Sequence, residues 1–213
     1  MLMGMPATAS AQSRPSSRSF ELGAEALWIG GSVVGESQAT ETRNQTGPAD
    51  RLTLFEVDAR MRSAPGLDAH IAYSVTPTIA IEGGFTYSRP SVATSIANDF
   101  EGSPDLRLSD SPLQQYFADG GIVFHLTRLP IGPMEPFLAA SVGYLRQVTE
   151  GRVSVTTGRI YEIGGGLKQV LTPRRRIGLR VDARLGVRDG GLTMGTHQRR
   201  PFFMAGAGTF VVF

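Results

Sequence analysis

The sequence predicts an all-β protein, an eight-stranded antiparallel transmembrane β-barrel with short turns at one end and long loops at the other. The first observation is the segment 177–188, in which apolar side chains alternate with polar ones or glycine. A period of two indicates a strand, because successive side chains point to opposite faces of a sheet. Three arginines, an aspartate and two glycines share one face, which suits a strand with lipid on one side and a polar interior on the other. Two further observations agree: seven other segments alternate, and their connections are short and long in turn.

The first four predicted strands follow from this alternation. Residues 19–33 begin with SFELGAEALW, residues 79–88 read IAIEGGFTYS, and residues 114–126 alternate from Tyr116 onward. The second strand ends at Val75. The segment 52–62 also alternates, and we interpret it as the outer part of that second strand, projecting beyond the membrane. A bulge or kink is expected at the intervening Ser-Ala-Pro-Gly of 63–66.

The last four predicted strands are residues 136–148, 159–170, 177–188 and 201–213. In the first of these, Leu138, Ala140, Val142 and Tyr144 are expected to face outward. Short connections are predicted at 76–78, 127–135 and 172–176, and long polar loops near 35–51, 89–112, 149–158 and 189–200. An even number of strands places both ends of the barrel on the short-turn, periplasmic side.

Composition narrows the class of protein. The 213 residues suit one domain, and a net charge of +2 without a basic stripe gives no sign of nucleic-acid binding. The chain has no cysteine and no run of about 20 apolar residues. Ala9-Ser10-Ala11 has the form of a signal-peptidase site. We therefore expect 1–11 to be the end of a signal peptide, 12–18 a polar lead, and 19–213 the barrel domain.

The alternation gathers charged side chains on the interior face of the predicted barrel. Eight strands enclose a space that side chains just fill, and an isolated buried charge costs several kcal/mol. We expect opposite charges to pair and plug the interior, with interior glycines leaving room for long arginines. The expected network consists of Glu21, Glu25, Asp68, Glu82, Asp119, Glu162, Lys168, Arg180, Asp182, Arg184 and Arg188, and His70 and His125 are also present.

Three local features carry a family resemblance: a Tyr-x-x-x-Pro turn at 73–77, the pair Gly143-Tyr144, and an Ala-Gly-Ala-Gly strand ending in Phe213. Together they resemble small eight-stranded outer-membrane barrels of the OmpX, OmpW and opacity type. The resemblance implies a place in the bacterial outer membrane and implies that Phe213 is the recognition signal for the barrel-assembly machinery. Phe210 and Val212 depart from the pattern, because interior-facing residues there are usually polar.

Other partners follow from the predicted position of the chain in a membrane. Outer-membrane lipids, including lipopolysaccharide, are expected to contact the barrel, with Arg199 and Arg200 at the outer rim near the lipopolysaccharide phosphates. The aromatic residues expected to form girdles at the two membrane interfaces are Trp28, Tyr73, Tyr87, Tyr116, Tyr144 and Phe213. We expect a monomer.

The sequence gives little support for a catalytic site, a metal site or a cofactor site. His125-Leu126-Thr127 resembles the His-x-Ser of outer-membrane deacylases, but threonine replaces serine and the site is periplasmic. His197 has no serine nearby, and the acidic residues of 98–110 match no calcium loop. We expect a structural or surface-interaction protein that is not an enzyme. The alternatives are a narrow pore for small solutes and a soluble, exported lipocalin-like ligand binder.

Overall fold

The computed structural model describes residues 18–42, 51–97, 104–108, 110–149, 154–172, 176–193 and 199–213. The expected signal segment 1–11 and nearly all of the lead lie outside these residues. In the described part, no helix has the length and apolar character needed to cross a membrane. The strands are β1 (Phe20–Ile29), β2 (Ser32–Thr42), β3 (Arg51–Met61), β4 (Ala64–Ser74), β5 (Ile79–Ser88), β6 (Ser91–Ala97), β7 (Leu106–Arg107), β8 (Ser111–His125), β9 (Glu135–Thr149), β10 (Ser154–Thr172), β11 (Ile177–Gly190) and β12 (Arg200–Val212).

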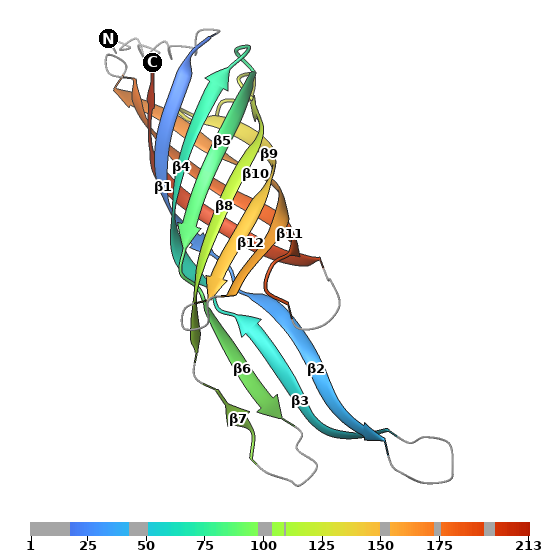
Figure 1. Ribbon diagram of the computed structural model, residues 1–213. Coiled ribbons are helices and arrows are strands. Elements are labelled where there is room, and N and C mark those ends of the chain that lie inside the picture. Colours follow the sequence, from blue (N-terminus) through green and yellow to red (C-terminus); the bar gives the residue numbers. More distant parts are fainter. Residues whose placement is uncertain are drawn as a thin grey trace, which may run out of the picture.

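Eight of these strands close into an antiparallel barrel, which confirms the predicted fold (Figure 1). The order around the barrel is β1-β4-β5-β8-β9-β10-β11-β12, and β12 pairs with β1. At this last pairing, the Phe213 N–H donates to the Phe20 carbonyl at 2.8 Å. The predicted strand 79–88 matches β5, and the other barrel strands differ from their predicted ends by a few residues.

The outer wall of the barrel is an apolar surface. Leu67, Ile163 and Leu185 are 65%, 66% and 63% exposed, although each lies in the middle of a strand. The intervening residues face inward and are mostly buried, as the burial patterns of β4 and β11 show. The predicted facing of β9 is confirmed, because Leu138, Val142 and Tyr144 are all exposed. Alternation along the chain therefore produces an apolar wall around a largely polar interior.

A second sheet projects from one end of the barrel, opposite the end at which β1 starts and β12 finishes (Figure 1). It contains β2, β3 and β6, and β7 pairs with β6. This corrects the predicted loops 35–51 and 89–112, which contain strands. The interpretation of 52–62 as a projecting continuation of the second strand agrees with β3, which leads into β4 through Arg62 and Ser63. Pro65 and Gly66 lie inside β4 and not at a break.

The chain leaves the barrel at Gly30-Gly31, between β1 and β2. A Cβ on Gly31 would lie 2.6 Å from the Met61 carbonyl oxygen, so only glycine allows this close approach. An apolar cluster fills the junction between the barrel and the projecting sheet. Its buried members are Val34, Ala59, Met61, Val92 and Leu113, with Leu192 packed against them.

Candidate functional site

The barrel interior brings together most of the charged residues that the sequence pattern selects. They come from β1, β4, β5, β10 and β11, and the strand register sets their level. Glu25 lies opposite Asp68, and Lys168 lies opposite Arg180. Glycines oppose several of the larger side chains, as Gly164 opposes Arg184. The register therefore stacks the charges within one part of the barrel.

Arg180 is the centre of this cluster and is completely buried. Its Nε lies 3.0 Å from Glu25 Oε1, and its Nη1 lies 2.6 Å from Glu82 Oε2. Its Nη2 lies 3.0 Å from Asp182 Oδ2. The guanidinium also lies over the Phe137 ring, 4.7 Å from the ring centroid. Because these partners belong to β1, β5, β11 and β9, one side chain links four strands.

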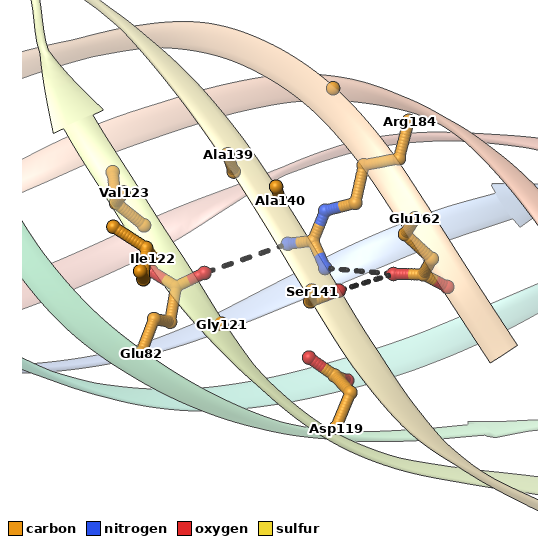
Figure 2. Close-up of a pocket in the computed structure, with 11 residues that line it drawn as sticks. Glu82, Asp119, Gly121, Ile122, Val123, Ala139, Ala140, Ser141, Glu162 and Arg184 are labelled. Carbon is orange, nitrogen blue, oxygen red and sulfur yellow. Dashed lines mark hydrogen bonds and ion pairs between the residues drawn. The ribbon is translucent and has the colours of Figure 1, made fainter.

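Arg184 forms a second centre, which Figure 2 shows between Glu82 and Glu162. Its Nη2 lies 3.1 Å from Asp182 Oδ2, and its Nη1 lies 3.7 Å from Glu162 Oε2. Ser141 Oγ donates to the same Glu162 oxygen at 3.3 Å. The two arginines share Asp182 and Glu82, so the cluster is one continuous network.

Asp119 points from β8 into the space beside these groups (Figure 2). Gly84 opposes it, and a Cβ on that glycine would lie 2.9 Å from Asp119 Oδ2. The remaining cavity is about 10 Å³, room for roughly one water molecule. Among the described residues, no basic group lies within 4.0 Å of the Asp119 carboxylate. Asp119 is thus near the network without an ion pair of its own.

His70 joins the network on its β4 side and is 2% exposed. Its Nε2 lies 3.6 Å from Glu21 Oε1, and its Nδ1 lies 3.5 Å from Asp68 Oδ1 and 3.7 Å from Glu25 Oε1. Lys168 Nζ lies 2.5 Å from Glu21 Oε1. The alternation of β4, with Asp68 and His70 on one face, was the sequence signal that places this histidine in the interior.

Arg188 is buried, but the structure separates it from the carboxylates. Its Nη1 donates to Ser32 Oγ at 3.3 Å and to Met61 Sδ at 3.2 Å. The guanidinium lies over the Phe202 ring at 4.4 Å and the Phe117 ring at 5.6 Å. In the part of the chain that the structure describes, no carboxylate oxygen comes within 4.0 Å of it.

The barrel interior also contains an apolar layer that was not predicted from the sequence. The expected interior was charged throughout, yet a buried hydrophobic cluster lies on the inward face. The signal lay in the strand parts near the long connections, where the inward positions become apolar. The cluster consists of Leu27, Ile29, Phe117, Leu145, Ile160, Phe202 and Met204.

Comparison with known structures agrees with this architecture. The crystal structure of Neisserial surface protein A matches with a TM-score of 0.56 and 12% sequence identity, covering 90% of this chain and 96% of that one. The crystal structure of the outer membrane protein OprG from Pseudomonas aeruginosa matches with a TM-score of 0.59 and 12% identity, covering 92% and 96%. The chain has the fold of a small outer-membrane β-barrel. No protein-family model matches its sequence, and no curated protein matches it.

The histidines of this outer-membrane-type barrel have carboxylate neighbours. His125 Nδ1 lies 3.3 Å from Glu135 Oε1, and His70 is surrounded by acidic groups. No serine or threonine hydroxyl is hydrogen-bonded to either histidine within the described ranges. A histidine that activates a serine or threonine nucleophile needs such a hydroxyl within reach, and the described part of the chain places none at either histidine. His197 lies outside the described residues.

One trio in the barrel interior has the residue types of a metal site. Glu21, His70 and Glu82 each offer a ligand atom, and these atoms lie within 4.8 Å of one another. Lys168 is paired with Glu21, however, and Arg180 is paired with Glu82. A divalent cation would meet both of these positive charges at close range. The donor set therefore favours the observed ion pairs over a metal.

Proposed function

We propose that the chain is a bacterial outer-membrane protein whose barrel is a closed anchor and whose projecting sheet contacts partners outside the cell. In this proposal the turns at 76–78 and 127–134 face the periplasm, and β2, β3, β6 and β7 extend outward. The protein works as a monomer and carries no catalytic centre.

The apolar outer wall supports a membrane location. Exposed apolar residues such as Leu22, Ile71 and Val142 lie within barrel strands. A contiguous apolar surface around a whole barrel is unfavourable in water and favourable in lipid. The interior is lined by buried charges, whereas a lipocalin-like binder needs an apolar cavity. These two facts together argue against the soluble alternative.

The observation that carries the closed-anchor proposal is the stack of fully buried side chains across the barrel. Arg180, Phe137, Leu145 and Ile160 are all 2% exposed or less. The charge network and the apolar layer occupy successive levels, and Phe117 stacks on Phe202 with 5.9 Å between ring centroids. Close packing at two levels leaves little room for a solute path.

Contact with lipid phosphates is proposed at the outer interface, where two arginines lie on the wall. Arg146 and Arg159 are exposed, and the register places them diagonally across β9 and β10. Tyr144 and Tyr161 flank them, as expected for an aromatic girdle. An arginine on the lipid face costs little only near the interface. Arg200, also at this end of the barrel, donates from Nη1 to the Leu192 carbonyl, 2.5 Å away.

Single-channel recording in planar lipid bilayers tests the closed-anchor proposal. We expect no conductance steps from the purified full chain, while a general porin reconstituted in parallel conducts. Regular openings of the unaltered protein would overturn the proposal in favour of a pore.

A further inference from the structure

At the outer mouth of the barrel lie two basic side chains that have no acidic partner within 4.0 Å among the residues that the structure describes. Arg188 on β11 lies opposite Arg200 on β12, so both side chains project from the same face of the sheet. Arg188 is 3% exposed, and Arg200 is half-buried. Elsewhere in the interior the arginines contact several carboxylates each, as Arg180 and Arg184 do. Arg188 and Arg200 differ from Arg180 and Arg184 in this respect.

Three guanidinium nitrogens of the pair are buried and have no hydrogen-bond partner among the described residues. They are Nε and Nη2 of Arg188 and Nη2 of Arg200. The remaining donors are engaged, since Arg188 Nη1 binds Ser32 and Arg200 Nη1 binds the Leu192 carbonyl. An arginine stays charged when buried, and a buried charge without a counter-ion is strongly destabilising.

The described acidic residues nearest to Arg188 and Arg200 do not supply the missing counter-ion. Glu162 lies two positions beyond the β10 residue that opposes Arg188, but its Oε2 contacts Arg184 and Ser141. Asp189 follows Arg188 directly, so strand alternation places it on the outward face. The rings of Phe117 and Phe202 supply cation–π contacts, which are worth about 0.5–2 kcal/mol each and provide no hydrogen-bond acceptor in the guanidinium plane.

We propose that Arg188 and Arg200 form a binding site for a small tetrahedral oxyanion, phosphate or sulfate, at the outer mouth of the barrel. Nε and Nη2 form one edge of the Arg188 guanidinium, and such an edge donates two parallel hydrogen bonds to two oxygens of one anion. Arg200 Nη2 supplies a donor for a third oxygen. A carboxylate has only two oxygens, so three donors match a tetrahedral anion better.

The burial of Arg188 favours a small free anion as the ligand. Half-buried Ser32, Arg200 and Leu192 lie around it, since Ser32 accepts from Arg188, Arg200 opposes Arg188, and the Leu192 carbonyl accepts from Arg200. A lipid headgroup or a glycan chain would need to displace the apolar junction of Met61, Val34 and their neighbours. The site is independent of the closed-anchor proposal, because it lies at the mouth and requires no path through the barrel.

Titration of the full chain with inorganic phosphate, followed by NMR of arginine Nε–Hε groups in maltoside micelles, tests the site. We expect a saturable shift of the Arg188 resonance, identified by its loss in R188K, with sulfate acting alike. Sodium chloride at equal ionic strength should give no saturable shift. R200Q should weaken phosphate binding roughly tenfold or more, the effect of losing one charge-assisted hydrogen bond.

The control is R128Q, which alters an exposed arginine in the turn at the other end, and it should bind phosphate normally. Migration on unheated gels confirms that each variant is folded. No saturable shift with phosphate or sulfate would overturn the proposal, and would indicate that a carboxylate from an outer connection neutralises the pair. Equal phosphate affinity in R200Q and the parent would also overturn it.

Discussion

Arg180 Nη1 lies 2.6 Å from Glu82 Oε2, although 98 positions separate the two residues along the chain. This ion pair spans the barrel interior from β11 to β5. Glu82 Oε1 also accepts a hydrogen bond from Arg180 Nη2 at 3.0 Å, so the pair is bidentate. The contact fixes two strands that are not neighbours in the sheet.

Replacing Glu82 with leucine should therefore destabilise the folded barrel. The change leaves Arg180 with fewer carboxylates, and breaking a buried ion pair costs about 3–5 kcal/mol. Urea unfolding in detergent micelles, followed by the fluorescence of the single tryptophan Trp28, measures the free energy of unfolding. The matched control is Glu36→Leu, an exposed acid on β2. Equal losses in the two variants would show that the buried pair adds nothing to stability.

The fold could be predicted because alternation is a strong signal wherever one face of a strand meets lipid. In the projecting sheet the segment 52–62 of β3 gave such a signal, whereas β2 did not. The sequence of β2, SVVGESQATET, has mostly polar residues on both faces because both faces meet water. Its pairing with β3 becomes visible only in the backbone register.

Strand parity alone predicted which charged residues face the barrel interior. It did not predict which of these residues reach the carboxylates of the network. Parity puts Arg188 and Arg180 on one face but does not give their depth along the barrel. Arg188 lies at the level of Phe117 and Phe202, beyond the reach of the carboxylates. Depth depends on the relative stagger of all eight strands, which no single segment encodes.

A second prediction compares two adjacent residues on opposite faces of β11. Arg184→Leu should destabilise the barrel by about 3–5 kcal/mol, because it leaves Asp182 and Glu162 without this cation. Leu185→Ala should cost much less, because Leu185 faces outward and is surrounded by detergent or lipid. Unfolding curves of both variants in the same micelles give the comparison. Equal destabilisation would mean that the assigned facing of β11 is wrong.

A third prediction concerns the packing of a ring on a glycine. A Cβ on Gly186 would lie 2.4 Å from Cζ of Phe202, its register partner on β12. Gly186→Ala should lower the free energy of unfolding by about 1–3 kcal/mol through overpacking. Phe202→Leu in the same chain should restore part of that loss, since it removes the clashing end of the ring.

The control for this pair is Gly120→Ala. Its Cβ would meet only the Glu82 carbonyl oxygen, at 3.9 Å, on the outward face. Calorimetric melting of the four proteins in one detergent separates the effects. Equal melting temperatures of Gly186→Ala and Gly120→Ala would show that the packing of the Phe202 ring does not require glycine at position 186.

A fourth prediction addresses the arginines on the outer wall. The double variant R146A/R159A should retain less lipopolysaccharide during purification from outer membranes, because it loses both cations that are proposed to contact lipid phosphates. Phosphate assay and native mass spectrometry of the purified barrel measure the retained lipid. Arg128→Ala, in the exposed turn between β8 and β9 at the opposite end of the barrel, should retain as much as the parent. Unchanged retention in R146A/R159A would remove these residues from lipid recognition.

The last prediction separates assembly in the cell from stability of the finished barrel. Phe213 faces outward and is 69% exposed, so its ring buries little surface in the folded chain. Its backbone still pairs with Phe20, and Phe213→Ala preserves that pairing. We therefore expect Phe213→Ala to refold in micelles with nearly the parent's free energy of unfolding.

The same variant should accumulate poorly in the outer membrane if the terminal ring is the assembly signal. Phe203→Ala is the matched control, because Phe203 is an outward-facing ring on β12, the strand that ends one residue before Phe213. Equal accumulation of the two variants, measured by heat-modifiable migration of membrane fractions, would contradict a special role for the terminal residue.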